Sequence, residues 1–230
     1  MKTVGIIGGL GPETTSEFYL KVIFGCYQKN KDARPPILLW SVPLEYAIED
    51  DLLQRSVGEE RYIPYVTDAA KRLEKGGADF LVMPCNSLHA FIDKIRNSVK
   101  IPVLSILEET TKTLKKEGLF KIGILSISIT RKRKLYEKIF YENNMISVLP
   151  SDSNQQKLNN IIYNLVMGKN NVKYLGDLQE INNALIKDRA ECVLLACTDL
   201  QLLNLQNSEI KIYDSMHILA NASVEYMLSQ

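Results

Sequence analysis

Two cysteines stand in matching sequence contexts, and they have the clearest capacity for chemistry in this chain. Residues 78–88 read ADFLVMPCNSL and residues 190–200 read AECVLLACTDL, so the two segments align without a gap. Cys85 and Cys197 therefore occupy equivalent positions of an internal repeat. A pair of thiols on opposite sides of a substrate can remove a proton from one face of a carbon atom and return one to the other face.

The residues after each cysteine predict how the thiol and a substrate would be held. A cysteine between a strand and the first turn of a helix meets unpaired backbone N–H groups, which lower the pKa of its thiol below about 8.5. Removing the α-proton of an amino acid places charge on its carboxylate, which then needs donors. We expect the backbone N–H groups of Asn86, Ser87 and Leu88 to supply them. The Asn86 amide and the hydroxyls of Ser87 and Thr198 are further donors.

A glycine-rich segment near the N-terminus, GGLGPE at residues 8–13, ends a predicted strand and opens a predicted helix. Pro12 is well placed at the first helical position. The segment has neither the third glycine of the dinucleotide fingerprint nor the lysine of a P-loop, which argues against a nucleotide site. We expect Leu10 and Gly11 to line the cleft or to bind a carboxylate, with a plain tight turn as the alternative.

The other cysteines and the two histidines favour structural roles. Cys26 lies in a predicted helix and Cys192 in a predicted strand, where a buried thiol acts as a small apolar group. His89 comes one turn after Cys85 and could tune that thiol, but a hydrogen-bonded structural role is more common; His217 is interpreted in the same way. The cysteines lack the paired spacing of a zinc site or a disulfide scaffold, so we predict no metal. We also predict no cofactor, because two opposed bases can racemise an amino acid without one.

Composition limits the classes of partner. The chain has 230 residues, 46% of them hydrophobic, which is enough for one large core or two small ones. Its 28 Lys and Arg nearly balance 27 Asp and Glu, which argues against nucleic acid and membrane partners. No segment approaches the ~20 apolar residues of a membrane span, and the N-terminal apolar run is too short for a signal peptide. We therefore expect a soluble, cytoplasmic protein with reduced thiols.

The elements that must position the cysteines follow an alternating pattern. Short apolar runs alternate with segments of helical period, which is typical of a parallel sheet covered by helices. The predicted strands are residues 4–7, 37–42, 80–83, 101–104, 122–125, 192–195 and 210–213. Two apolar stripes predict amphipathic helices: Tyr62, Val66, Ala69, Ala70 and Leu73; and Leu158, Ile161, Ile162, Leu165 and Val166. Glycines mark predicted helix C-termini at Gly76, Gly77 and Gly118, and residues 151–157 and 168–173 are interpreted as loop or helix edge.

The repeat extends to the start of each half, because residues 4–7 (VGII) match residues 122–125 (IGIL). We therefore predict an α/β fold of two similar αβα lobes with parallel sheets related by pseudo-twofold symmetry. Residues 1–102 plus 209–230 form the first predicted lobe, and residues 103–208 form the second. Ligands bind outside the carboxyl ends of the strands in open α/β sheets, so facing lobes would bring both cysteines to one cleft between them.

Three motifs together resemble those of aspartate racemases in the aspartate/glutamate racemase superfamily: GGLGPE at residues 8–13, MPCNSLH at residues 83–89 and ACTD at residues 196–199. The resemblance covers the chain in order. It implies two αβα domains with the active site between them, and usually a homodimer. It makes Cys85 and Cys197 the acid/base pair and matches Asn86, Ser87 and Thr198 to positions that hold the substrate carboxylate.

The sequence departs from that family in several places. Three positions differ from the common residues: Ser87 for threonine, Ala196 for glycine and Asp199 for glutamate. Some aspartate racemases hold the distal carboxylate with an arginine and a lysine, and the approximately matching positions here are Ile48 and Met167. Arg55, Arg61 and Lys169 lie nearby in the sequence and could substitute for them.

The resulting hypothesis is interconversion of L- and D-aspartate, with glutamate as a second substrate. Three alternatives stay open. The first is another reaction on the same scaffold, either isomerisation of maleate through a covalent cysteine adduct or protonation of an enolate after decarboxylation. The second is a binding module without catalysis, since such modules also have two lobes around a cleft. A redox pair formed by the two cysteines is the third, disfavoured by the expected cytoplasmic setting.

Overall fold

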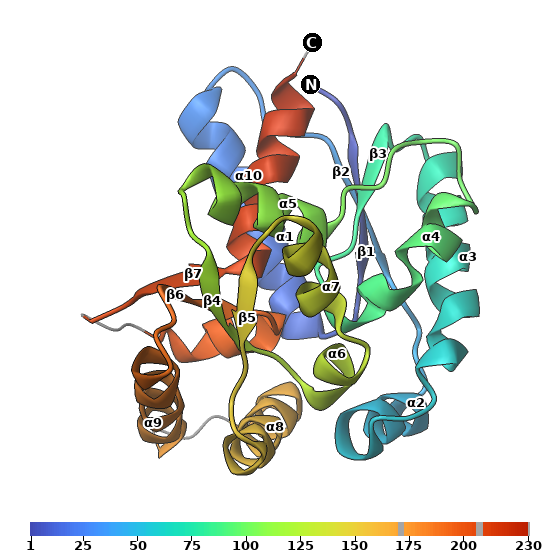
Figure 1. Ribbon diagram of the computed structural model, residues 1–230. Helices are drawn as coiled ribbons and strands as arrows, with labels where there is room; N and C mark the ends of the chain where they lie inside the picture. Colours follow the sequence, from blue (N-terminus) through green and yellow to red (C-terminus); the bar gives the residue numbers. More distant parts are fainter. Residues whose placement is uncertain (170–172, 206–208, 230) are drawn as a thin grey trace.

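The protein forms two parallel β-sheets with helices around and between them (Figure 1). The computed structural model describes residues 1–169, 173–205 and 209–229. The first sheet, in the order β2-β1-β3, consists of β1 (Val4–Gly8), β2 (Ile37–Ser41) and β3 (Phe80–Val82). The second, in the order β5-β4-β6-β7, consists of β4 (Lys121–Leu125), β5 (Ile146–Val148), β6 (Cys192–Leu195) and β7 (Lys211–Asp214). All of these strand pairs are parallel, which confirms the predicted α/β class.

Helices connect the strands in both sheets. The α-helices are α1 (Pro12–Lys29), α2 (Tyr46–Asp50), α3 (Ile63–Lys75), α4 (Ile92–Arg96), α5 (Ile106–Lys116), α6 (Ser128–Lys132), α7 (Leu135–Glu142), α8 (Asp152–Val166), α9 (Lys173–Lys187) and α10 (Ser215–Leu228). Shorter turns are the π-helix η1 (Asp51–Arg55) and the 3-10 helices η2 (Glu59–Tyr62), η3 (Ser87–Phe91) and η4 (Thr198–Leu203). Among the described residues, no helix has the length and apolar character needed to cross a bilayer.

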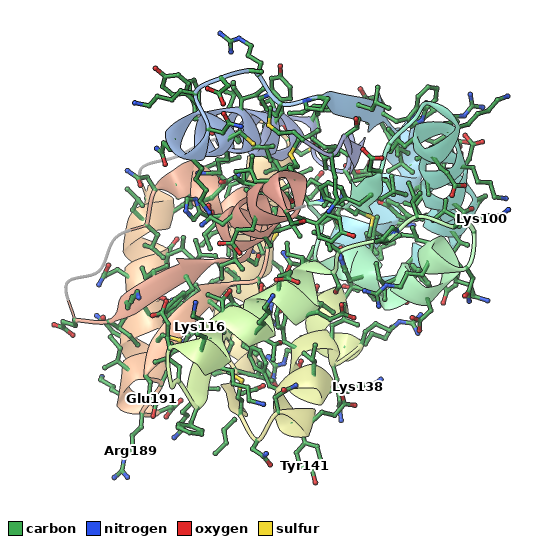
Figure 2. All side chains as sticks on the ribbon, turned by 90° about the horizontal axis from the view of Figure 1, so that it is seen from above. Lys100, Lys116, Lys138, Tyr141, Arg189 and Glu191 are labelled. Atoms are coloured by element: carbon green, nitrogen blue, oxygen red, sulfur yellow. The ribbon has the colours of Figure 1, made fainter. Side chains whose placement is uncertain are left out.

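A layer of helices lies between the two sheets. Helix α10 packs against both α1 and α5 in the middle of the molecule (Figure 1). Val4 and Ile6 of β1 point into the same buried cluster as Ile122 and Ile124 of β4. One core therefore joins the inner faces of both sheets. Long basic side chains point outward from the surface, as Figure 2 shows for Lys100, Lys138 and Arg189.

The internal repeat has a direct structural counterpart. Asp79, at the start of the first copy, accepts a hydrogen bond from the backbone N–H of Thr3 at 2.6 Å. Glu191, its equivalent in the second copy, accepts one from the backbone N–H of Phe120 at 2.7 Å. Each acidic residue thus holds the beginning of the strand next to its own, β1 or β4. The two halves repeat this contact as well as the strand pattern.

Some predicted elements differ from the structure. Residues 101–104 form only an isolated bridge, between Val103 and Leu81, instead of a strand. Strand β5 was not predicted, because its three residues, with Ile146 exposed, carry little apolar pattern. Residues 152–157 are helical within α8, capped by Ser151, and residues 170–172 of the other polar stretch lie outside the described residues.

The predicted assignment of residues 209–230 to the first lobe is wrong for β7, which pairs with β6 in the second sheet. Helix α10 contacts α1, which follows β1, but it also contacts α5. Elsewhere the division of the chain into lobes stays a prediction. Both predicted amphipathic stripes are confirmed, since Val66 and Leu73 of α3 and Leu158 and Ile162 of α8 are buried.

Candidate active site

The segments that follow β3 and β6 meet at one pocket. Cys85 and Cys197 both line it, although 112 positions separate them in the chain. The other predicted site residues line the same pocket: Leu10, Gly11, Asn86, Ser87, Leu88 and Thr198. The remaining lining residues are Glu49, Leu52, Leu53, Tyr62, Ile127, Thr130, Ile162, Val166, Ala196 and Asp199. The structure thus brings the two cysteines and these six predicted substrate-binding residues to one place, and their roles stay predictions.

A tight turn presents Cys85 at the end of β3. Its backbone N–H donates to the Met83 carbonyl at 2.8 Å, and its Sγ lies 3.6 Å from the Ser87 hydroxyl. Burial raises the pKa of the Cys85 thiol, and the Asp199 carboxylate raises it further, while the backbone N–H groups of Leu88 and Ser87 and the Ser87 hydroxyl lower it. The net direction is upward.

Cys197 is more enclosed, with 9% of its surface exposed. Its Sγ donates to Oδ2 of Asp199 at 3.5 Å. Burial raises the pKa of this thiol well above its ordinary value, and the negative charge of Asp199 acts in the same direction. The predicted lowering of the pKa is therefore wrong for both thiols, because burial and a carboxylate outweigh the N–H groups.

Asp199 offers the pocket an acceptor that the protein does not use. Its Oδ1 is buried and accepts no hydrogen bond from the described residues. Burial raises the pKa of this carboxyl to about 6, so the group is ionised at neutral pH. A Cβ atom at Gly11 would lie 3.1 Å from this oxygen, so glycine lets the first loop approach it closely. An unpaired carboxylate oxygen at this position suits a ligand ammonium group.

Thr130 is a second buried polar group in the pocket wall without a partner. Its Oγ1 has no hydrogen-bond partner among the described residues, and the side chain is 1% exposed. Sequence reasoning missed it. The repeat could have indicated it, because Thr130 follows β4 as the segment containing Gly11 follows β1.

Comparison with known proteins identifies the family of this chain. A model of the Asp/Glu/hydantoin racemase family matches residues 7–223. The chain belongs to this family. The resemblance inferred from the three motifs is therefore confirmed.

Individual relatives of this racemase-family chain cover its whole length. It is 30% identical to the broad specificity amino-acid racemase RacX of Bacillus subtilis (strain 168) over 231 residues, which is 98% of each chain. The solved structure of an aspartate racemase homologue from Pyrococcus horikoshii OT3 superposes with a TM-score of 0.80 at 27% identity, covering 100% of both chains. Aspartate racemase of Picrophilus torridus superposes with a TM-score of 0.80 at 22% identity, covering 99% of this chain and 94% of that one. The two-lobe racemase fold is thereby established.

In this pocket the Asn86 side chain links the two halves. Its Oδ1 accepts from the Tyr136 hydroxyl at 2.6 Å, and its Nδ2 donates to Ser215 at 3.1 Å. Ser215 donates in turn to the Leu195 carbonyl of β6 at 2.8 Å. The amide that we expected to hold a substrate therefore also ties the turn after β3 to the strand that precedes Cys197.

Of the two histidines, His89 has a structural role. Burial lowers the pKa of His89 to about 4, so its imidazole is neutral at pH 7. Its Nδ1 donates to the Cys85 carbonyl at 2.7 Å, and its Nε2 accepts from the backbone N–H of Ile106 at 3.1 Å. His89 therefore positions the backbone of Cys85 instead of its thiol. His217 is exposed on α10 and does not line the pocket.

The basic residues proposed to bind a distal carboxylate do not line the pocket. Arg55 and Arg61 both pair with Asp51, at 3.0 Å and 2.5 Å. Lys169 is exposed, and neither it nor the arginines line the pocket. The matching positions Ile48 and Met167 are also absent from the lining. Within the described residues, no group of three or more His, Cys, Asp or Glu side chains is arranged to hold a metal ion.

Proposed function

We propose that this protein interconverts the L and D forms of an α-amino acid without a cofactor, with Cys85 and Cys197 as the two acid/base groups. The observation that carries the proposal is the convergence of both thiols, from equivalent positions of the repeat, on one pocket. Membership of the racemase family and the likeness to RacX, a broad specificity amino-acid racemase, support an amino acid as substrate.

The pocket has separate polar groups for the α-carboxylate and for the α-ammonium group of an amino acid. The backbone N–H groups after Cys85 and the buried hydroxyls of Thr130 and Thr198 suit the α-carboxylate, whose charge grows when the α-proton leaves. The unpaired oxygen of Asp199 suits the α-ammonium group. In each turnover one cysteine thiolate takes the α-proton and the opposite thiol returns a proton, so the two sulfurs exchange protonation states.

The raised thiol pKa values fit this reaction. A thiolate with a high pKa is rare but strongly basic, which suits removal of a proton from a weakly acidic carbon atom. The charge of Asp199 raises the pKa of both thiols. A substrate ammonium beside Asp199 neutralises that charge, and substrate binding therefore favours formation of the thiolate that the reaction needs.

Exchange of the α-proton tests the mechanism. The reduced protein is incubated with a panel of L-amino acids in D2O, followed by proton NMR and chiral chromatography. We expect Cys85→Ala and Cys197→Ala each to lower racemisation by about 1000-fold or more. Cys26→Ala removes a buried thiol outside the pocket and serves as the matched control, with activity retained. Racemisation within tenfold of the wild type in either pocket variant would refute the two-cysteine mechanism.

The same preparation separates the alternative chemistries. A covalent adduct with maleate, seen by mass spectrometry, would favour the isomerase. Release of CO2 from a malonate-type acid would favour the decarboxylase. Tight binding that survives both cysteine substitutions, without turnover by the wild type, would favour a binding module.

Three finer expectations came from the sequence, and this proposal keeps two of them: a homodimer, which the resemblance implies, and a cytoplasmic location. Sedimentation velocity at several protein concentrations tests the homodimer. Aspartate, with glutamate second, is the substrate that the motifs predict. That preference requires a cation for the distal carboxylate, and the described pocket lining contains no lysine, arginine or histidine.

A further inference from the structure

One wall of the pocket is apolar with a single acidic group. It is built by the α2-η1 segment and α8, which contact each other through Gln54 and Tyr163 at 2.9 Å. Its apolar side chains are Leu52 and Leu53 of η1 and Ile162 and Val166 of α8. Its one charged side chain is Glu49, at the end of α2.

Glu49 has no compensating charge among the described residues. Its carboxylate is half-buried and takes part in no hydrogen bond or ion pair there. Burial raises the pKa of Glu49, and the neighbouring carboxylates of Asp50 and Glu13 raise it further. The charge of Glu49 in turn raises the pKa of two other lining residues, Asp199 and Tyr62.

Two arginines of neighbouring segments, Arg61 and Arg133, form ion pairs away from the pocket. Arg61 pairs with Asp51 at 2.5 Å, and Arg133 binds Glu59, with Nε at 2.8 Å from Oε1. Neither arginine lines the pocket. A distal carboxylate would therefore enter an apolar wall whose one charge has the same sign as its own, and a like charge in a partly desolvated site is unfavourable.

The pocket offers two carboxylates to one substrate. Asp199 adjoins Cys197 and suits the α-ammonium group, which every amino acid carries. Glu49 then remains as the acceptor for a second positive charge. The aliphatic side chains between α2-η1 and α8 suit the methylene groups that would separate the two charges.

Given the proposed racemase function, we infer that the substrate side chain is an aliphatic chain ending in a cation, as in lysine and ornithine, and that Glu49 binds that cation. Acidic amino acids are then poor substrates. Glu49 is a specificity-determining residue in this assignment, and it takes no part in the proton transfers at the α-carbon.

Rates with three amino acids test the assignment. Lysine carries the cation, norleucine has an aliphatic chain without it, and aspartate carries the opposite charge. We expect kcat/KM to fall in the order L-lysine, L-norleucine, L-aspartate. Glu49→Gln should lower the ratio of kcat/KM for lysine to that for norleucine by about tenfold, which corresponds to about 1.4 kcal/mol. Glu49→Ala should lower the same ratio, which would show that the effect comes from loss of the carboxylate and not from the glutamine side chain that replaces it.

Asp50→Asn is the matched control. It removes one negative charge from the same helix at a residue that does not line the pocket, so the ratio should stay within about twofold of the wild-type ratio. Faster turnover of aspartate than of lysine, or an unchanged ratio in both Glu49 variants, would overturn the assignment and leave the two-cysteine mechanism standing. Absence of α-proton exchange with every amino acid would instead refute the racemase function, and this assignment with it.

Discussion

Replacing Asp199 by asparagine should stabilise the protein above pH 7. Burial raises the pKa of this carboxyl from its ordinary value of 3.8 to about 6. Between these two pH values the folded chain holds a proton that the unfolded chain has lost, so stability falls as the pH rises through this window. A tenfold change in proton affinity corresponds to about 1.4 kcal/mol, so the charged carboxylate costs the folded state about 3 kcal/mol above pH 7.

Urea unfolding of the wild type and of Asp199→Asn at several pH values measures this cost. The free energy of unfolding of the variant minus that of the wild type should rise by about 2.5 kcal/mol between pH 4 and pH 8, with most of the change below pH 7. Asp188→Asn, at an exposed residue of the same chemical type, is the control. A difference that is flat with pH, or that falls as the pH rises, would refute the reasoning.

Two further substitutions test the contacts that join the halves. Tyr136→Phe removes the donor to Oδ1 of Asn86 and should lower the free energy of unfolding by about 1–3 kcal/mol in urea; an unchanged value would mean that this bond is not structural. Burial acts to raise the pKa of Glu59, but a hydrogen bond from its own backbone N–H, the hydrogen bond and charge of Arg133 and the charge of Lys132 together bring it below its ordinary value. These contacts stabilise the fold above about pH 4.5, and the effect is lost on acidification. Arg133→Met should therefore lower the melting temperature more at pH 7 than at pH 4, and an equal loss at both pH values would contradict this.

The placement of the two thiols could be predicted from the sequence because it depends on the repeat. Equivalent strands β3 and β6 end at equivalent residues, and parallel strands direct their carboxyl ends to one edge of each sheet. The segment around Gly11 was predictable for the same reason, since it follows β1 in the same sheet. Local pattern and topology were sufficient for this part of the site.

The pocket wall built by the α2-η1 segment and α8 could not be predicted in this way, and neither could the thiol pKa values. Glu49 reaches the pocket because the α2-η1 segment meets α8, a contact between distant segments that neither one encodes in its own pattern. The thiol pKa values depend on burial and on the Asp199 carboxylate, two consequences of tertiary packing. Strand β7 was assigned to the wrong lobe, because sequence order alone does not identify the partner of an edge strand.

The two thiols have unlike neighbours, a hydroxyl 3.6 Å from Cys85 and a carboxylate 3.5 Å from Cys197. Mirror-image substrates have equal free energies, so a racemase works at an equilibrium constant of unity, and kcat/KM must be the same in both directions whatever surrounds each sulfur. The asymmetry can appear only in kcat and KM taken separately. If one enantiomer is turned over faster at saturation, it must also show the proportionally higher KM, and at low concentration the enzyme cannot distinguish the two.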